Sequence, residues 1–517
     1  MPETKPETKQ CILAIDQGTT STRVVGFDLD GTLIATAQQE HQQIYPQNGW
    51  VEHDPEEIWQ HTKKGLVDVF EQVTHKGYAP ENIRGIGITN QRETVVAWDK
   101  KTNAVLYNAI VWQDKRTASL CTELKNIHGV KIRNKTGLPT DPYFSGSKMH
   151  WLLHHVDAVK EANKQGTLAF GTMDSFLLWR LTGGKNHLTD STNASRTLLF
   201  NIHKMAWSEE LTTLFGIPPQ TLPTVCPNTF DFGQTAEGLL PRTLPIAAMA
   251  GDQHAATFGQ ACFEKGMVKS TYGTGCFALM NTGNMAKTSQ NGLLTTLAYH
   301  TGQHPVYALE GSIFVAGAAV RWLRDQLGLI RTADETEALA KQAEKDTPNG
   351  DDVYLVPAFA GLGAPWWDSQ AKGALVGMTL NTNKATIAKA TLEAVGFQSH
   401  DLFSAMASDS GQAITEVRVD GGMVVNNWLC QRLACLTQTP IQRPKVTETT
   451  ALGAAWMAGL QLGLYKNTEQ LTQLWQAQQT FKPLLEKDTV EKKRLGWHNA
   501  LAAVRHQTSK QPKTGEI

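Results

Sequence analysis

The chain has 517 residues, enough for roughly three average domains or two large ones. Hydrophobic residues make up 41% and charged residues 19%, a globular balance that excludes collagen-like and disordered classes. The formal net charge is −1, so the chain lacks the basic field that a nucleic-acid partner requires. The seven cysteines form no C-x-x-C pair, and no apolar run is long enough for a membrane helix. We therefore expect a cytoplasmic protein with reduced thiols, no nucleic-acid partner and no transmembrane segment.

Residues 11–40 contain three apolar runs separated by two turns. The first run ends at Gly18 and the second ends at Asp30-Gly31, a spacing that predicts a β-meander. Residues 53–73 have the spacing of an amphipathic helix, with Asp54 as its N-cap and Pro55 in its first turn. Residues 83–89 then read as a buried strand.

A comparable organisation returns in the second half. Residues 267–283 again contain two apolar runs separated by a Gly-Thr turn. Residues 306–327 are expected to pass from a strand through Gly311-Ser312 into a helix. Residues 416–437 predict a strand, a Gly-Gly turn and an amphipathic helix. The two Gly-Thr turns lie about half the chain apart, which predicts two similar α/β domains that face each other. The charged segment after residue 485 is expected to end disordered.

The segment from Asp16 to Arg23 has the residue types of a phosphate-binding turn. Glycine lets the backbone turn sharply and brings its N–H groups close to an anion. Hydroxyl side chains and one cation add donors, and Asp16 could hold a magnesium ion through water. These donors are Thr19, Thr20, Ser21 and Arg23. Taken alone, the segment is explained equally well as a hairpin turn.

Two further glycine turns lie in the second half. Residues 270–275 resemble the first turn, and one such turn in each half favours a polyphosphate held between two domains. The segment Asp420-Gly-Gly422 leads to Asn426 and could pack an adenine or ribose against backbone, although a tight strand–helix connection explains it as well. The sequence lacks a P-loop, a complete G-x-G-x-x-G, a protein-kinase catalytic loop and G-x-S-x-G.

Polar clusters follow several apolar runs, at positions where α/β folds bind ligands. They are residues 90–93, 141–143 and 251–253. A polyol suits such clusters because each of its hydroxyls both donates and accepts a hydrogen bond. Trp112 and Phe277 could face the carbon edge of that ligand, although packing in the core is their default role.

Two other patterns suggest different chemistry. Residues 27–33 spell the nucleophile motif of haloacid-dehalogenase-type phosphatases, and Gly350-Asp-Asp352 could mimic the later acidic pair of that class. A third apolar run follows this motif where a helix should follow, so Asp30-Gly31 is better interpreted as a hairpin turn. His150 and His154 are four apart on an expected helix, but no third metal ligand is evident.

At these motifs the sequence resembles the FGGY carbohydrate kinases, especially those that act on glycerol. The segments are AIDQGTTSTR, GITNQRET, YNAIVWQ, DPYFSG, NASRTLLFNI, AGDQHAATFGQ, TYGTGCF, GLGAPWWD and RVDGGMVVNNW, in order between residues 11 and about 480. The resemblance implies an α/β actin-like ATPase fold, with two ribonuclease-H-like domains around a central cleft. We expect a disordered tail (1–10), an N-terminal domain for glycerol and phosphate (11–254), a C-terminal nucleotide domain (255–485), and a helix with a flexible tail (486–517).

The resemblance also implies an activity, the Mg²⁺- and ATP-dependent phosphorylation of glycerol to sn-glycerol 3-phosphate. The implied glycerol-binding residues are Arg92, Glu93, Tyr143, Asp252 and Gln253, with Trp112 and Phe277 along the hydrocarbon side. Asp252 is the implied catalytic base, and Asp16 the expected magnesium ligand, through water. The implied nucleotide-binding residues are Thr19, Thr20, Ser21, Arg23, Thr274, Gly317, Arg321, Gly422 and Asn426.

The chain departs from the family pattern at two places. Arg321 stands where many glycerol-phosphorylating members have Gln, so its contact with the nucleotide stays open. Residues 233–246 lack the Gly-rich, Arg-containing loop that binds fructose 1,6-bisphosphate in some bacterial members, and the His that a phosphocarrier modifies in others. We expect neither control to operate here, and a homodimer or homotetramer by analogy with the family.

Two alternative functions remain open from the sequence. A sister kinase would act on a ketopentose, a tetritol or another sugar and would need a roomier acceptor pocket. An actin- or chaperone-like ATPase would hydrolyse ATP without a polyol and would have no use for the cluster around Asp252.

Overall fold

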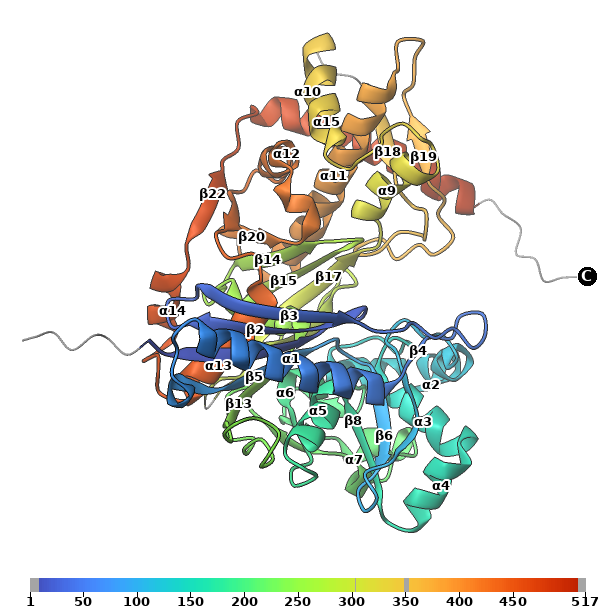
Figure 1. Ribbon diagram of the computed structural model, residues 1–517. Coiled ribbons are helices and arrows are strands. Elements are labelled where there is room, and N and C mark those ends of the chain that lie inside the picture. The colour runs from blue at the N-terminus through green and yellow to red at the C-terminus, as the bar shows by residue number, and fades with distance from the viewer. Residues whose placement is uncertain (1–8, 303, 348–352, 510–517) are drawn as a thin grey trace, which may run out of the picture.

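The computed structural model describes residues 9–302, 304–347 and 353–509. Residues 1–8 of the expected N-terminal tail, residues 510–517 of the expected C-terminal tail and Gly350-Asp-Asp352 lie outside the described residues. Two α/β halves are stacked in Figure 1, the first mostly blue to green and below, the second mostly yellow to red and above. The order of their strands shows that both halves have the same plan.

The first half is built on a five-stranded sheet of order β13-β5-β1-β2-β3. Strands β1 to β3 form an antiparallel meander, as predicted, while β5 and β13 are parallel to β1. The strands are β1 (Cys11–Gln17), β2 (Ser21–Asp28), β3 (Leu33–Glu40), β5 (Ile83–Asn90) and β13 (Ile246–Gly251). Helix α1 (Pro55–His75) packs on β2 and β3 and starts as predicted, with the Asp54 carboxylate accepting from Glu56 N at 2.8 Å.

The second half contains a seven-stranded sheet of order β16-β17-β15-β14-β20-β21-β22. Its inner strands β17-β15-β14-β20-β21 repeat the antiparallel and parallel pairings of β3-β2-β1-β5-β13. The strands are β14 (Met267–Tyr272), β15 (Cys276–Gly283), β16 (Leu294–Tyr299), β17 (Val306–Ile313), β20 (Glu416–Asp420), β21 (Ile441–Pro444) and β22 (Ala477–Phe481). The prediction of two similar halves is therefore confirmed.

One boundary prediction is wrong. Gly311 and Ser312 do not separate a strand from a helix, because both lie inside β17 and pair with β15. Helix α9 (Gly317–Asp325) begins five residues after Ser312. A Cβ on Gly311 would lie 2.3 Å from the Leu402 side chain, so this glycine allows close packing and does not mark a turn.

Two helices join the halves at a close crossing. Helix α8 (Asp252–Gly259) follows β13, and α13 (Thr449–Gln461) comes from the second half but packs on β1, β5 and β13 of the first sheet. In Figure 1 the orange α13 lies among the blue strands. A Cβ on Gly259 would meet Thr449 O at 2.0 Å, and one on Gly453 would meet Ala255 O at 1.8 Å. The two backbones therefore touch because both contact residues are glycines.

The other elements extend the two halves. A four-stranded antiparallel sheet of order β4-β7-β6-β8 and helices α2–α7 belong to the first half, and helices α9–α12, α14 and α15 to the second. The bounds in the first half are β4 (Glu52–His53), η1 (Pro80–Asn82), β6 (Val95–Asp99), β7 (Val105–Ile110), α2 (Ala118–Thr136), α3 (Ser145–His155), α4 (Asp157–Lys164), β8 (Leu168–Thr172), α5 (Met173–Leu181), β9 (Leu188–Asp190), α6 (Ser191–Ala194), β10 (Phe200–Asn201), β11 (Ala206–Trp207), α7 (Glu209–Leu214), η2 (Pro219–Thr221) and β12 (Thr224–Cys226). Those in the second half are α10 (Glu335–Asp346), β18 (Tyr354–Val356), β19 (Ala374–Val376), α11 (Lys384–Ser410), η3 (Gly422–Val425), α12 (Asn427–Thr437), α14 (Thr468–Leu474) and α15 (Lys487–Ser509).

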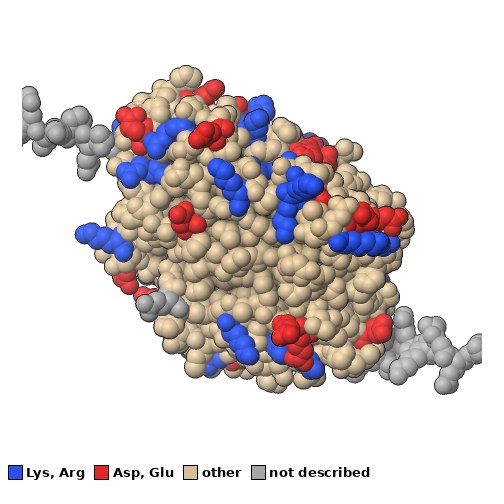
Figure 2. All heavy atoms as spheres, turned by 90° about the horizontal axis from the view of Figure 1, so that it is seen from below, with Lys and Arg blue, Asp and Glu red and all other residues tan. Residues whose placement is uncertain are grey.

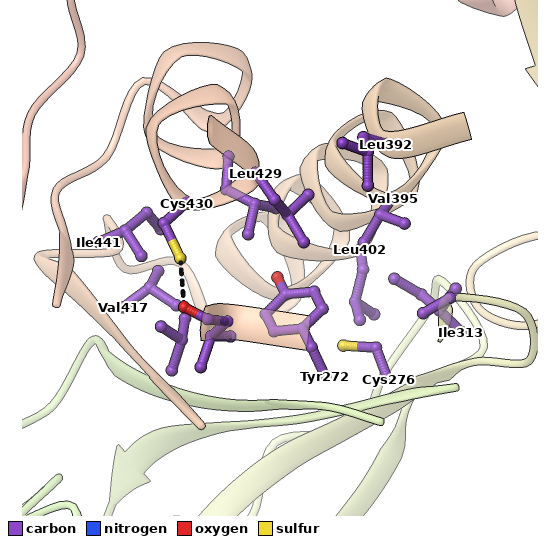
Figure 3. Packing of buried hydrophobic residues seen from close by; sticks show 14 of the residues in the cluster. Tyr272, Cys276, Ile313, Leu392, Val395, Leu402, Val417, Leu429, Cys430 and Ile441 are labelled. Atoms are coloured by element: carbon purple, nitrogen blue, oxygen red, sulfur yellow. Dashed lines mark hydrogen bonds between the residues drawn. The ribbon is translucent and has the colours of Figure 1, made fainter. Parts of the chain in front are cut away.

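The largest core of the second half lies between its sheet and helices α11 and α12, as Figure 3 shows. Tyr272 stands at its centre, and its hydroxyl shares a 2.9 Å hydrogen bond with Ser399 of α11. The Cys430 thiol donates to Val424 O at 3.3 Å. All seven cysteines are buried free thiols. This core supports the turn after β14 and the segment after β20, where the sequence predicts nucleotide contacts.

The charged side chains of the surface are spread without a strong patch of one sign in the view of Figure 2. Figure 2 shows basic and acidic side chains interspersed around a largely uncharged middle, so that face carries no field of one sign. Among the described residues no helix is long and apolar enough to cross a membrane.

Asp30-Gly31 is the turn between β2 and β3, as predicted, with Gly31 at φ +87°. His150 and His154 stack on α3, and no group of three potential metal ligands occurs in the described part of the chain.

Candidate active site

The charged residues at the ends of β5 and β13 meet in one buried cluster. Arg92 follows β5 and donates from Nη1 and Nη2 to the Glu310 carboxylate, each at 2.9 Å. Its Nε lies 3.1 Å from Oδ1 of Asp252, the first residue of α8. Burial opposes ionisation of Glu310, but the charges of Arg196 and Arg92 hold its pKa well below the usual range. Arg92 and Asp252 thus come together, as the sequence predicted.

Glu93 occupies the same cluster in an unusual backbone conformation. Its φ of +62° is in the left-handed region, which costs a non-glycine residue about 1–3 kcal/mol and is found most often at functional sites. Arg196 Nε donates to Glu93 Oε1 at 2.6 Å, and Ser145 Oγ donates to Glu93 O at 3.0 Å. Burial raises the pKa of Glu93, although the charges of Arg196 and Arg92 oppose this. These contacts hold the strained residue in place.

Two of the predicted aromatic side chains meet beside this cluster, and Phe277 lies on the second sheet. The Trp112 and Tyr143 rings meet edge to face at 5.5 Å, and Trp112 Nε1 donates to Thr19 Oγ1 at 3.0 Å. Burial and the charge of Glu93 raise the pKa of Tyr143, so its hydroxyl stays protonated. Phe277 is half-buried on β15, between Thr271 of β14 and Ser312 of β17. The indole of Trp112 thus links the predicted polyol site to the first glycine turn.

Two buried lysines donate hydrogen bonds that hold predicted site residues in place. Lys148 donates from Nζ to the carbonyl oxygens of Pro142, Tyr143 and Phe144, at 2.5, 2.7 and 3.3 Å, and so holds the loop that carries Tyr143. Lys269 of β14 donates from Nζ to Gln253 Oε1 at 2.6 Å. Because an ammonium group only donates, the Gln253 amide nitrogen must point the other way.

The first glycine turn lies beside residues from the second half. Arg23 of β2 forms an ion pair with Glu448, the N-cap of α13, and donates from Nε to Gln38 Oε1 at 2.9 Å. Thr20 is exposed and Ser21 half-buried, and Ser21 Oγ accepts from Gln38 Nε2 at 3.1 Å. The two halves thus approach each other at this turn.

Asp16, at the end of β1, carries the most perturbed carboxylate near that turn. Burial raises its pKa to about 7, Arg23 opposes the rise, and the nearby charges of Asp252 and Glu448 add to it. Concentrated negative charge of this kind suits a divalent cation held by oxygen ligands. Asp16 therefore offers one carboxylate that would suit Mg²⁺ held through water.

A cavity of about 510 Å³ opens between the turn after β14 and helices α9, α10 and α12. Five predicted nucleotide-binding residues line it, namely Thr274, Gly317, Arg321, Gly422 and Asn426. A Cβ on Gly317 would lie 2.6 Å from Gly273 O, so any larger residue would disturb this wall. Arg321, whose role the sequence left open, faces the cavity and donates to Thr274 Oγ1 at 3.0 Å. Such a volume suits a nucleoside.

Sequence matches place this architecture in a known family. The N-terminal-domain model of the FGGY family of carbohydrate kinases matches residues 11–259, and the C-terminal-domain model matches residues 268–462. The chain belongs to the FGGY family of carbohydrate kinases. The predicted two-domain, actin-like fold of that family is therefore confirmed, and the protein is a kinase.

Individual FGGY kinases are similar over nearly the whole chain. Glycerol kinases from Alcanivorax borkumensis and Trichlorobacter lovleyi are 53% and 52% identical over 494 and 492 residues, which is 95% of this chain and 98% of each relative. The crystal structure of Plasmodium falciparum glycerol kinase with ADP superposes with a TM-score of 0.91 at 36% identity, over 97% of this chain and 99% of that one. A gluconate kinase from Lactobacillus acidophilus, at 21% identity and a TM-score of 0.84 over 98% and 99% of the chains, shares the fold.

Sequence reasoning missed several charged side chains of this FGGY kinase site. They are Lys148, Arg196, Lys269, Glu310 and Glu448. Glu310 and Lys269 each stand alone as a charge inside an otherwise buried strand, a pattern that indicates a paired or functional residue. Arg196 is fully buried and lies more than 100 positions from both of its acidic partners, so local spacing gives no sign of its contacts.

Proposed function

We propose that this kinase transfers the γ-phosphoryl group of ATP to glycerol and releases sn-glycerol 3-phosphate and ADP. The observation that carries the proposal is the buried cluster in which Arg92, Glu93 and Asp252 lie together at strand ends. Relatives named glycerol kinase, at 51–53% identity over at least 95% of the chain, support glycerol as the acceptor.

In this proposal the cluster binds glycerol through its hydroxyls. The Glu93 and Asp252 carboxylates accept from hydroxyls, while Arg92 and the Gln253 amide nitrogen donate to them. Tyr143 adds a neutral hydroxyl, and Trp112 and Phe277 lie along the hydrocarbon side. A polyol is favoured because the cluster offers donors and acceptors side by side.

Asp252 acts as the general base. Arg92 Nε and the Gln253 backbone N–H both contact its Oδ1, the latter at 2.6 Å. Oδ2 therefore remains to take the proton from the attacking hydroxyl, whose oxygen then forms the new bond to phosphorus as the bond to ADP breaks. About one third of the Asp252 side chain is exposed, which leaves room for an acceptor.

The nucleotide lies between the two halves. Its adenosine occupies the cavity lined by Gly317, Arg321, Gly422 and Asn426, and its phosphates contact Thr274 and the first glycine turn. In that turn Thr19, Thr20, Ser21 and Arg23 supply the donors. Asp16 would hold Mg²⁺ through water, and the ion would neutralise charge on the phosphates.

The test is a measurement of ADP release with MgATP and a series of acceptors. The series contains glycerol, dihydroxyacetone, erythritol, xylulose, ribulose and gluconate, together with a blank that has no acceptor. We expect turnover to favour glycerol strongly. Preference for a longer sugar would leave the nucleotide site standing and overturn the acceptor assignment. High turnover in the blank would indicate an ATPase of the actin or chaperone kind.

We also infer that the enzyme works in the cytoplasm, where ATP is available, and assembles as a homodimer or homotetramer. Both inferences rest on the family resemblance. Sedimentation equilibrium at several protein concentrations measures the assembly, and a monomer at micromolar concentration would contradict it.

A further inference from the structure

Glu310 is the centre of the charged cluster and links the two halves. It lies on β17 of the second sheet, whereas Arg92 and Arg196 come from the first half. Arg92 Nη1 and Nη2 donate to its two oxygens at 2.9 and 2.9 Å, and Arg196 Nη1 and Nη2 donate to the same two oxygens at 3.0 and 3.3 Å. These four charge-assisted hydrogen bonds saturate the carboxylate.

Each arginine also directs its remaining Nε toward carboxylates other than that of Glu310. Arg92 Nε lies 3.1 Å from Asp252 Oδ1, and Arg196 Nε donates to Glu93 Oε1 at 2.6 Å. Because a guanidinium is planar and its donors form a fixed fork, holding both Nη atoms on Glu310 also fixes the direction of Nε. The five side chains therefore form a rigid row of alternating charges that runs from Asp252 through Arg92, Glu310 and Arg196 to Glu93. Arg92 Nε also lies 3.9 Å from Glu93 Oε1, which closes the last four members of the row into a ring.

The row is buried except at one end. The side chains of Arg196, Glu93, Arg92 and Glu310 are 0–3% exposed, whereas that of Asp252 is 32% exposed. Buried ion pairs contribute little net stability compared with apolar side chains of the same volume, because desolvation offsets their attraction. The row therefore needs a role other than stability, and both of its ends are residues to which we assign hydroxyl contacts.

Building on the proposed function, we propose that Glu310 and Arg196 are positioning residues that fix the spacing of Asp252 and Glu93 and thereby select a three-carbon polyol over a longer one. Two carboxylates at a fixed separation accept two hydroxyls at a matching separation. A longer acceptor cannot place its hydroxyls on both carboxylates while its reacting oxygen stays in line with the phosphoryl group. A misplacement of about 1 Å at such a site costs about 100-fold in rate.

The test compares two variants of the full-length enzyme. Arg196→Lys keeps the charge but loses the fork, and Glu310→Gln keeps the shape but loses the charge. Steady-state rates give kcat and KM for glycerol, erythritol and ATP. We expect kcat/KM to fall about 100-fold for glycerol and about 10-fold or less for erythritol, so that the preference for glycerol narrows about 10-fold. KM for ATP should stay within about 2-fold, because neither residue lines the nucleotide cavity.

Arg432→Lys is the matched control. Arg432 is also a buried arginine that pairs with two glutamates, Glu344 and Glu393, but it lies on α12 away from the cluster. Its substitution disturbs a buried ion pair without touching the row, so the preference for glycerol should stay within about 2-fold of the wild type. Thermal melts and ADP binding show which variants are folded, and Glu310→Asp replaces Glu310→Gln if the latter does not fold.

The outcomes separate this inference from the proposed function. Folded variants that lose the same factor with glycerol and erythritol would overturn the positioning role and leave the function standing. Wild-type enzyme that does not phosphorylate glycerol would overturn the proposed function itself. A narrowed preference in the Arg196 and Glu310 variants but not in the Arg432 variant supports the inference.

Discussion

At the scale of single residues, the chemistry depends on the carboxylate that starts α8. In the proposed mechanism Asp252 acts only on the acceptor, whereas other side chains line the nucleotide cavity. We expect Asp252→Asn to lower kcat by about 10³-fold, because an amide cannot take the proton and general-base catalysis is worth roughly 10²–10⁴-fold. The affinity for ADP should change by less than about 3-fold. Rapid-quench rates and calorimetric ADP titrations measure the two effects.

Asp157→Asn is the control for that substitution, because the Asp157 side chain is 96% exposed on α4. It should leave kcat and ADP affinity unchanged. Near-normal turnover in the Asp252 variant would remove this residue from the role of base.

The lowered pKa of a second residue, His53 of β4, predicts how the stability of the protein depends on pH. Its buried ring hydrogen-bonds Gln43 Oε1 at 2.9 Å, and Gln43 Nε2 donates to Thr19 O in the first glycine turn. Burial, with the nearby His41, lowers the pKa of His53 from 6.5 to about 3. Between these values the unfolded chain binds a proton that the folded chain does not, so the free energy of unfolding falls as the pH is lowered.

The free energy of unfolding is expected to fall by about 2 kcal/mol between pH 6.5 and pH 5, since one pKa unit corresponds to about 1.4 kcal/mol. His53→Asn removes this group. The variant should be less stable than the wild type at pH 8, and the gap should narrow by about 2 kcal/mol at pH 5. Urea unfolding of both proteins at pH 8, 6.5 and 5 measures the gap, and a constant gap would contradict the prediction.

At the scale of elements, the crossing of α8 and α13 positions the site. Gly453→Ala would place a Cβ 1.8 Å from Ala255 O, so the helices must separate. We expect a loss of about 1–3 kcal/mol in stability. We also expect a fall in kcat, because α8 carries Asp252. Gly302→Ala is the control, since a Cβ there meets nothing within 4 Å. Denaturant unfolding and initial rates test both variants; equal stabilities would show that the helices can adjust.

Local signals explain which elements could be predicted. The meander, the Asp54-capped helix and the glycine turns each arise from neighbouring residues, so their residue types and spacing were sufficient. Gly311 misled the prediction because a glycine that allows Leu402 to pack closely looks the same in sequence as one that makes a turn. Arg196 and Glu310 were missed because their contacts join segments 103 to 218 positions apart, which only the folded sheets bring together.

At the scale of the whole molecule, the two repeated sheets meet through α8 and α13, the Arg23–Glu448 ion pair and the row centred on Glu310. All three contacts join the first half to the second beside the residues assigned to substrate binding. Movement of one half against the other would therefore alter the acceptor site and the phosphate turn together. Closure of the halves would then exclude water, a competing acceptor, from the acceptor site and the phosphate turn together.

The composition of residues 233–246 bears on control by a phosphorylated sugar. A bisphosphate carries several negative charges and needs several cations or free backbone N–H groups. Residues 233–246 contain one cation, Arg242, which donates to Pro80 O at 3.2 Å, and one acidic residue, Glu237. We therefore expect fructose 1,6-bisphosphate at millimolar concentration to leave the initial rate unchanged.

Initial rates at subsaturating glycerol, with the bisphosphate titrated to about 5 mM at constant ionic strength, measure this effect. Constant ionic strength matters because a multivalent anion also screens charges. Inorganic phosphate at matched charge is the control for such screening and for chelation of Mg²⁺. Saturable inhibition by the bisphosphate, absent with phosphate, would contradict the prediction. Equal, shallow responses to both anions would place any loss of rate in the cleft, where phosphate groups compete with ATP.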